Sequence, residues 1–264
     1  MSILRYLVAI ACIGVLAACA PPPPAPKPVA SKPASPPKPE LTGLQSALNR
    51  HGVPLHVPQK GKAILVNIPS YELIALEDGE EVFRSRVIVG APGRDRETPI
   101  LDTFTSVARF LPTWRPTPTM IRTGAYTDGV RPPGRRNPLG LVALRLEPGM
   151  LVYLHDTNKP QLFDRDKRAL SWGCVRVDGI ERLITWALDM EQADYAALTS
   201  GRRTFDVPTY DMIPVMLRYY TAFPDAAGNL RYHDDIYGQG ETILRRSPEP
   251  GEPREPVTMA PVTG

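Results

Sequence analysis

Clustered prolines set the strongest limit on which part of this chain can fold into a compact domain. Of the 31 prolines, ten lie between Pro21 and Pro39, five lie in the last 17 residues, and 16 lie between residues 41 and 247. A Pro/Ala/Lys segment has little to bury and is held extended, at about 3.1 Å per residue. We therefore predict a Pro-rich linker over residues 19–40 and a disordered Pro-rich tail over residues 248–264. A proline-rich ligand for a partner domain is the alternative for the first run.

The N-terminal segment has the pattern of a secretory signal. Arg5 precedes an apolar run of 11 residues, Tyr6 to Leu16, which is too short to span a membrane. The run leads into Leu-Ala-Ala-Cys19, which resembles the lipobox of bacterial lipoproteins. That resemblance implies a signal peptide over residues 1–18 and acyl chains on Cys19 as a membrane anchor. Because Ala20 follows the cysteine, it also implies a periplasmic protein held at the outer membrane. An ordinary signal peptide cleaved at a small residue is the alternative.

Removal of the signal would leave one free thiol. Cys12 would leave with the signal peptide and Cys19 would be acylated, so Cys174 remains. Three cysteines cannot form a disulfide framework, and no pair has the spacing of zinc ligands. A formal charge of +3 over 264 residues gives no indication of a nucleic-acid partner. Cys174 is therefore a buried inert residue, half of an intermolecular disulfide, or a nucleophile.

The hydrophobic pattern of residues 62–247 is mainly that of β-strands. A capping pattern at Asp178 and Glu181, followed by an apolar face at helical spacing, predicts a helix that continues to Leu188. A shorter helix is predicted over residues 192–199, and a short helical lead-in over residues 41–61. Strands are predicted over residues 63–68, 71–76, 81–89, 104–111, 141–146, 150–154, 204–207, 213–223 and 230–237.

Two segments carry residues suited to acyl transfer. His155 ends a predicted strand, and Cys174 lies in the turn Ser171-Trp172-Gly173-Cys174, just before the predicted helix. An imidazole can take the thiol proton, and we expect the resulting ion pair and the helix N-terminus to favour the thiolate. Gly173 lets the backbone approach a substrate closely, so nearby N–H groups can face a developing oxyanion.

The order of these motifs resembles the L,D-transpeptidase (YkuD-type) catalytic domain. The signature is His155 followed by Ser171-x-Gly-Cys-Val-Arg176, and further blocks between residues 62 and 240 are similar to the YcbB-like branch of that family. The resemblance implies a mainly β, β-sandwich-like fold with one or two short helices. The blocks that carry it are Val66–Leu73, Arg86–Gly90, Thr98-Pro99, Trp114–Pro116, Pro133–Gly140, His155–Thr157 and Asp234–Gly238.

The resemblance also implies roles for the residues of the signature. Cys174 would be the nucleophile, and His155 would be the general base and acid, oriented by a backbone carbonyl. Ser171 and Gly173 would shape the nucleophile turn. Trp172 stands where many members of the family carry a second histidine, which leaves the His155–Cys174 pair intact.

Five further residues are candidates for substrate binding. Arg176 would brace the nucleophile turn or bind a substrate carboxylate, with a purely structural ion pair as the alternative. Asn137 and Gly140 would line the donor groove, or serve only a turn. Arg135 and Arg136 would attract substrate carboxylates, or belong to a solvated basic loop.

The implied reaction acts on peptidoglycan stem peptides. Cys174 would attack the carbonyl at the L-centre of diaminopimelate in a stem tetrapeptide, release D-Ala and pass the acyl group to an amine, giving a 3→3 cross-link. Water as acceptor would make a carboxypeptidase or amidase, and a protein lysine would make a wall-anchoring ligase. A sortase-like enzyme and a non-enzymatic, wall-binding lipoprotein scaffold are two further hypotheses. No metal or organic cofactor is expected, and residues 114–141 are expected to form a small lid.

Overall fold

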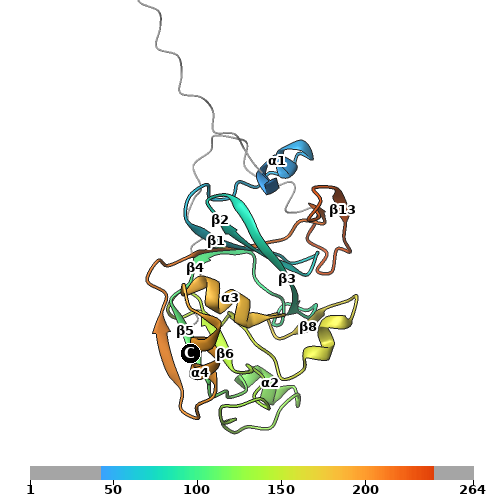
Figure 1. The fold of residues 1–264 in the computed structure, drawn as a ribbon. Coiled ribbons are helices and arrows are strands. Elements are labelled where there is room, and N and C mark those ends of the chain that lie inside the picture. The colour runs from blue at the N-terminus through green and yellow to red at the C-terminus, as the bar shows by residue number, and fades with distance from the viewer. Residues whose placement is uncertain (1–42, 241–264) are drawn as a thin grey trace, which may run out of the picture. The chain divides into compact units, whose positions relative to one another are not determined.

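Residues 43–240 are described by the computed structural model (Figure 1). The predicted signal peptide, the lipidation site at Cys19, the Pro-rich linker and the C-terminal tail lie outside the described residues. Within the described part of the chain, no helix is long and apolar enough to cross a membrane. The fold is mainly β with a few short helices, as the sequence predicted.

Strands account for most of the regular structure in residues 43–240. They are β1 (Lys62–Asn67), β2 (Glu72–Glu77), β3 (Glu80–Gly90), β4 (Leu101–Phe104), β5 (Val107–Phe110), β6 (Val142–Arg145), β7 (Tyr153–His155), β8 (Ala169–Ser171), β9 (Val175–Val177), β10 (Phe205–Pro208), β11 (Pro214–Arg218), β12 (Ala222–Pro224) and β13 (Leu230–Tyr232). The helices are α1 (Gly43–Arg50), α2 (Pro118–Arg122), α3 (Ile180–Ala187), α4 (Gln192–Thr199) and the 3-10 helix η1 (Pro160–Asp164).

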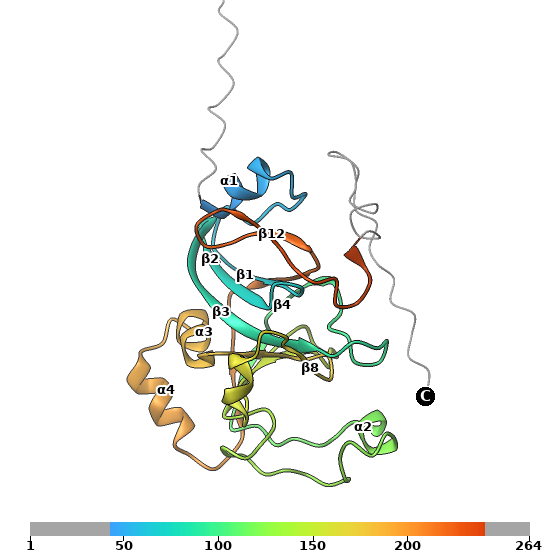
Figure 2. The same ribbon diagram turned by 90° about the vertical axis from the view of Figure 1, so that its right-hand side faces the viewer.

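Eleven strands form one mixed sheet whose two halves share β3. The order is β10-β5-β6-β7-β9-β3-β2-β1-β11-β4, with β8 paired to β3 off this path. The first part of β3 pairs with β2, and its last part pairs with β9 and β8. Figure 2 shows β3 running from the end of the domain near α1 to the level of β8. In the second half, β7 and β9 are parallel neighbours, in the register Leu154↔Val175 and His155↔Arg176.

One apolar core contains residues from both halves of the sheet. Ile64 and Val66 of β1 belong to it, together with Phe110 of β5 and Val175 of β9. Alternate residues of a strand point to opposite faces, so Leu65 of β1 lies in a second cluster, which packs beneath α1. The first half-sheet is therefore covered on both faces. This is the layering expected of the predicted β-sandwich-like fold.

Helix α3 confirms the predicted apolar face but not the predicted cap. The N-cap residue is Gly179, with φ +63°, and no side chain caps the helix. The carboxylate of Asp178 binds the guanidinium of Arg86 on β3 instead, at 2.7 Å. An ion pair across the fold therefore replaces the local cap. The residues that α3 buries in the core are Ile180, Leu183, Ile184 and Ala187.

Two of the predicted strands are each divided in the structure. In the 104–111 run, Phe104 is the last residue of β4, most of which was not predicted, and residues 107–110 form β5. The chain changes partner between them, because the N–H of Thr105 bonds to the loop before β11 and the N–H of Ser106 bonds to β6. The 213–223 run becomes β11, which pairs with β1 and β4, and β12, which pairs with β13 in a separate small sheet. The partner that each strand takes is set by residues far away in the sequence, so the local pattern could not locate these changes. In the 230–237 run, only β13 is a strand.

The lid segment, defined here as residues 114–141, connects β5 to β6 and contains α2, a helix that was not predicted. Thr117 caps α2, with its Oγ1 accepting from the N–H of Met120 at 3.3 Å, and Pro118 occupies the first helical position. Trp114 and Arg131 form a β-bridge within the segment. In Figures 1 and 2, α2 lies at the end of the described domain opposite α1.

Candidate active site

The nucleophile turn joins β8 to β9. Ser171 ends β8 and Cys174 directly precedes β9. Ser171 is buried, and its Oγ donates to the carbonyl of Cys174 at 2.5 Å and accepts from the N–H of Gly173 at 3.2 Å. Gly173 has φ +100°, a backbone conformation that residues with a Cβ rarely adopt. Ser171 and Gly173 therefore shape this turn.

His155 lies on β7, next to β9, the strand that Cys174 directly precedes. Its register partner on β9 is Arg176, so the side chains of His155 and Arg176 lie on one face of the sheet, and Cys174 lies two residues before Arg176 in the chain. The ring is buried, and Nδ1 donates to the carbonyl of Asp156 at 2.5 Å. Because a carbonyl can only accept, the proton is on Nδ1 and Nε2 keeps its lone pair. The carboxylate of Asp156 is engaged elsewhere, accepting from the backbone N–H groups of Leu141 and Thr157 at 2.8 and 2.7 Å.

Burial makes both groups neutral at neutral pH. Desolvation, reinforced by the positive charge of Arg176, lowers the pKa of His155 to about 3. Desolvation raises the pKa of the Cys174 thiol, against the opposing effects of the Tyr153 backbone and Arg176. Cys174 is half-buried, its Sγ donates to the carbonyl of Leu151 at 3.3 Å, and no hydrogen bond among residues 43–240 joins Sγ to the imidazole. The described residues therefore give no support to the thiolate–imidazolium pair that we expected from the sequence.

The N-terminus of α3 does not assist the thiol either. The helix begins at Ile180, and the whole of β9 separates it from Cys174. The influence of a helix dipole falls off within the first turn. The expected contribution of the helix to thiolate formation is therefore absent, and desolvation controls the thiol.

Arg176 places a guanidinium beside both reactive groups. Its Nε is buried and has no hydrogen-bond partner within the described domain. No ion pair between residues 43 and 240 includes Arg176. The described residues therefore give no support to a structural ion pair. A buried guanidinium N–H without a partner is suited to bind a carboxylate.

A cavity of about 640 Å³ lies beside the nucleophile turn. Trp172 forms one wall, the loop Gly93–Arg96 after β3 forms another, and Thr119, Thr123 and Ala125 of the lid segment complete it. The guanidinium of Arg96 lies 5.6 Å from the centre of the Trp172 ring. Trp172, predicted as part of the nucleophile turn and as a departure from the family pattern, therefore lines a groove between the nucleophile turn and the lid.

Asn137 and Gly140 stabilise the lid and do not line this cavity. The amide of Asn137 is buried, donates to the carbonyls of Pro112 and Pro132 at 2.9 and 3.0 Å, and accepts from a backbone N–H of the lid at 2.9 Å. Gly140 has φ +66°, and a Cβ there would lie 2.2 Å from a carboxylate oxygen of Asp156. Of the two roles that the sequence left open, lining the donor groove or serving a turn, these contacts agree with the turn for both residues.

Arg135 and Arg136 are exposed and are not brought together with Cys174. Arg135 lines a different cavity of about 540 Å³, together with Asp156 and Tyr195 of α4. Neither arginine lines the cavity beside Trp172. Attraction of substrate carboxylates by these side chains stays a prediction.

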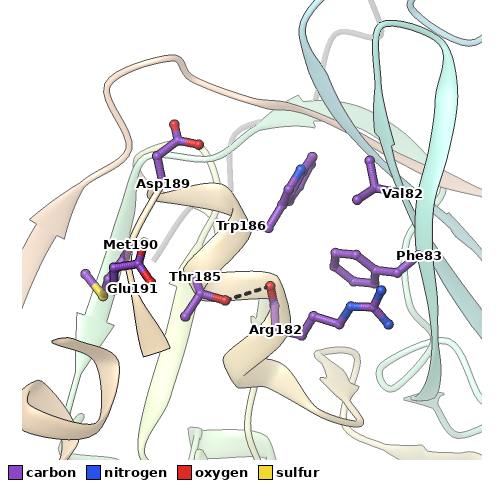
Figure 3. Close-up of a pocket in the computed structure, with 8 residues that line it drawn as sticks. All are labelled: Val82, Phe83, Arg182, Thr185, Trp186, Asp189, Met190 and Glu191. Carbon is purple, nitrogen blue, oxygen red and sulfur yellow. Dashed lines mark hydrogen bonds between the residues drawn. The ribbon is translucent and has the colours of Figure 1, made fainter. Parts of the chain in front are cut away.

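A third cavity lies on α3 and contains no predicted site residue. It has a volume of about 440 Å³. Figure 3 shows its side chains, with Phe83 and Trp186 in an edge-to-face contact 5.9 Å apart and Arg182 over the Phe83 ring at 4.4 Å. Neither here nor elsewhere in residues 43–240 do three or more His, Cys, Asp or Glu side chains group as a metal site would need.

Two residues that the sequence gave no role support the nucleophile turn, Thr98 directly and Tyr237 through Thr98. Thr98 donates from Oγ1 to the carbonyl of Gly173 at 2.9 Å, and the hydroxyl of Tyr237 accepts from the N–H of Thr98 at 3.2 Å. Both residues lie in blocks of the family resemblance, Thr98-Pro99 and Asp234–Gly238, and this was the only sequence signal that pointed to them. Such a block does not show which residues it contacts, so the contact of Thr98 with the nucleophile turn follows only from the fold.

Known proteins that are similar to this chain belong to one family. A family model described as the L,D-transpeptidase catalytic domain (YkuD) matches residues 61–210. A Haemophilus influenzae protein named as an L,D-transpeptidase is 29% identical over 231 residues, covering 71% of this chain and 46% of that protein, so the chain spans about half the length of this relative. An L,D-transpeptidase structure from Mycobacterium smegmatis and the catalytic domain from E. faecium are each 14% identical with a TM-score of 0.36; the matches cover 60% of this chain and 58% and 97% of theirs. On the match to the family model, the chain belongs to the L,D-transpeptidase catalytic domain (YkuD) family.

Proposed function

We propose that this domain is a peptidoglycan L,D-transpeptidase with Cys174 as the nucleophile and His155 as the general base and acid. The observation that carries the proposal is the pairing of β7 with β9 in a member of this family. The pairing brings the strand that ends at His155, whose Nε2 is free, beside the strand that the half-buried Cys174 directly precedes, and this supports the assignment. The YcbB-like branch is part of the proposal and rests on the sequence blocks alone.

A neutral thiol and a neutral imidazole suit a step in which the proton moves as the new bond forms. Sγ would attack the carbonyl at the L-centre of diaminopimelate in a stem tetrapeptide while His155 Nε2 takes the thiol proton. His155 would then give this proton to the departing amine of D-Ala as the C–N bond breaks, leaving a thioester on Cys174. The amine of a second diaminopimelate would attack the thioester, lose its proton through His155 and restore the thiol, giving a 3→3 cross-link.

The charges around the site support an anionic peptide as substrate. Stem peptides carry several carboxylates, and the buried Nε of Arg176 lacks a partner within residues 43–240. Arg96 adds a second cation at the wall of the cavity beside Trp172. Trp172 lines this cavity, whereas Cys174 and Arg176 do not. We place the donor stem along the cavity, with its reacting end passing Trp172 to reach Cys174 and one carboxylate near Arg176. A charge-assisted hydrogen bond of this kind is roughly twice as strong as a neutral one.

The turnover of disaccharide-tetrapeptides, followed by mass spectrometry, tests the proposal. We expect free D-Ala, an acyl adduct on Cys174 and dimers joined by 3→3 bonds. Cys174→Ala is expected to abolish all three, and His155→Gln to slow acylation by about 10²–10⁴-fold. Cys12→Ala is the matched control, because it makes the same substitution at a cysteine that would leave with the signal peptide. Unchanged turnover by Cys174→Ala would refute the nucleophile, and trimmed tripeptides without dimers would show that water is the acceptor.

The membrane anchor is a separate proposal that rests on the N-terminal sequence. Acyl chains on Cys19 would hold the protein at the outer membrane, and the Pro-rich linker would carry the catalytic domain toward the peptidoglycan. The mass of the mature N-terminal peptide tests it. An acylated Cys19 supports the anchor, whereas cleavage at another residue contradicts it.

A further inference from the structure

A ring of hydrogen bonds joins the C-terminal segment to the nucleophile turn. The hydroxyl of Tyr237 donates to the carbonyl of Gly90 at 2.6 Å and accepts from the N–H of Thr98 at 3.2 Å. The hydroxyl of Thr98 accepts from the N–H of Gly90 at 2.8 Å and donates to the carbonyl of Gly173 at 2.9 Å. Thr98 is only 2% exposed, so water competes little for these bonds.

Tyr237 is itself held from the core side. Its backbone N–H donates to the hydroxyl of Tyr219 at 2.7 Å, and that hydroxyl donates to the carboxylate of Asp235 at 2.6 Å. The rings of Tyr219 and Tyr237 stack, with 5.4 Å between their centres. Because Tyr219 is 1% exposed and belongs to the main core, the position of the Tyr237 hydroxyl is set by the core and not by solvent-exposed loops.

The contact with Gly173 determines the direction of the N–H of Cys174. The carbonyl of Gly173 and the N–H of Cys174 belong to one planar peptide unit, in which they point in opposite directions. A hydroxyl that holds the carbonyl therefore also orients the N–H. The neighbouring N–H, that of Gly173, already donates to Ser171 Oγ. This leaves the N–H of Cys174 as the donor of the turn closest to any oxyanion that forms on a carbon attached to Sγ.

We propose that Thr98 and Tyr237 are positioning residues for acyl transfer, which fix the Gly173–Cys174 peptide so that the N–H of Cys174 stabilises the oxyanion. This inference rests on the proposed function and deepens it. It also assigns a role to the Asp234–Gly238 block, which lies beyond the region matched by the family model. Neither residue touches the reacting atoms; both act through the peptide of the nucleophile turn.

Two reagents that modify the same thiol separate positioning from general damage. Imipenem acylates a thiol through an oxyanion: the S–C bond forms, the C–N bond of the β-lactam breaks, and the thiol proton ends on the ring nitrogen. Iodoacetamide alkylates the thiol by displacing iodide and losing the thiol proton to water, and no oxyanion forms. The ratio of the two rate constants therefore reports oxyanion stabilisation alone.

Thr98→Val removes the hydroxyl at nearly constant volume, and Thr98→Ser keeps it. We expect Thr98→Val to slow imipenem acylation roughly ten- to hundredfold, below the 10²–10³ typical of losing an oxyanion donor, because the N–H is misdirected and not removed. Its rate of alkylation and the pH profile of that rate should stay within about twofold of wild type, whereas Thr98→Ser should restore acylation to within about threefold.

Tyr237→Phe tests the outer part of the ring, with Tyr220→Phe as the matched control. Each variant removes one hydroxyl that donates to a backbone carbonyl, Gly90 for Tyr237 at 2.6 Å and Pro54 for Tyr220 at 3.1 Å. We expect Tyr237→Phe to slow acylation roughly fivefold to tenfold and Tyr220→Phe to leave it unchanged. If Thr98→Val does not unfold cooperatively, this pair decides the matter.

Three results would overturn the inference. They are unchanged acylation in both Thr98→Val and Tyr237→Phe, equal slowing of acylation and alkylation, and failure of Thr98→Ser to restore acylation. Failure of wild-type protein to cross-link tetrapeptides, with imipenem acylation intact, would overturn the proposed function alone. If imipenem does not acylate the wild-type thiol, both proposals fall.

Discussion

At the residue scale, burial decides how Cys174 and His155 work together. A thiolate–imidazolium pair needs both groups charged, but the protein desolvates both of them. Desolvation lowers the pKa of His155 to about 3 and raises the pKa of Cys174. Arg176 opposes the protonation of His155 and favours the thiolate, so it pushes both equilibria toward the unprotonated form. The resting site is therefore a thiol next to a base, and proton transfer is expected to wait for a substrate.

The pH dependence of Cys174 alkylation tests this resting state. Because the pKa of the thiol is raised above its ordinary value of 9.0, the thiolate fraction at any given pH is lower than for a free cysteine. The iodoacetamide rate should be very low at pH 7 and increase about tenfold per pH unit until the pH passes the raised pKa. Intact-mass measurements between about pH 5 and about pH 10 would follow it.

His155→Gln is the control for the alkylation experiment. A neutral imidazole contributes no charge, so the variant should have nearly the same alkylation profile as wild type. A preformed thiolate–imidazolium pair would behave differently, with a plateau of reactivity from about pH 5 to about pH 8 that His155→Gln removes. Such a plateau would show that the pair is charged in the free protein.

The identity of these two residues could be predicted, but their protonation could not. A lone thiol in a Ser-x-Gly-Cys turn, preceded by a strand-ending histidine, limits the candidates to Cys174 and His155. Protonation depends on what covers the pair and on the charge of Arg176 across β7 and β9, and these follow only from the pairing of strands. For the same reason the sequence assigned the helix N-terminus an effect that the intervening β9 prevents.

At the scale of elements, the lid is attached to the catalytic strand through Asp156. This residue directly follows β7, and its carboxylate accepts from the N–H of Leu141 at the end of the lid. The carboxylate fills the space where Gly140 would otherwise carry a Cβ. The backbone of Asp156 meanwhile orients His155. One residue therefore couples the position of the lid to the position of the His155 imidazole.

Gly140→Ala is expected to break this coupling, and Gly52→Ala is its matched control. Both glycines have φ +66°, but a Cβ at Gly52 meets nothing within 4 Å, whereas at Gly140 it overlaps the carboxyl group of Asp156. Backbone strain alone should cost Gly52→Ala about 1–2 kcal/mol of unfolding free energy. Gly140→Ala should cost about 3–5 kcal/mol, because Asp156 must also move. Urea unfolding of the two variants measures both; equal losses would show that Asp156 adjusts freely.

Helices and strands that depend on residues close in sequence could be predicted, whereas strand ends that depend on partners far away in the sequence could not. The apolar face of α3 and the strand over residues 63–68 depend on residues close in sequence, and both are confirmed. The division of the 104–111 run depends on Thr105 and Ser106 bonding to opposite halves of the sheet. Helix α2 has a local signal, because Thr117 is suited to cap a helix and Pro118 to begin one. The sequence could therefore have predicted it.

At the scale of the whole molecule, the fold extends beyond the region that the family model matches. That match ends at residue 210, but β11 lies between β1 and β4 in the sheet. Val215, Leu217 and Tyr219 of this part of the chain are buried in the main core. The following segment then returns to the nucleophile turn through Tyr237 and Thr98. Residues 211–240 therefore complete first the sheet and then the active site.

Three shortened chains should separate these two contributions. A chain ending at Gly240 keeps every described contact and should unfold cooperatively and react with imipenem as the full chain does. Ending at Tyr232 keeps β11 but removes Tyr237, so we expect a folded protein whose acylation is slowed at least as much as by Tyr237→Phe, roughly tenfold. Ending at Tyr210 removes β11, leaves β1 without its parallel neighbour and opens the core, so cooperative unfolding should be lost. Thermal unfolding by circular dichroism, together with imipenem acylation, measures all three chains. If the chain ending at Tyr210 unfolds cooperatively and reacts with imipenem, the family-matched region is sufficient for folding and acylation, and residues 211–240 are needed for neither.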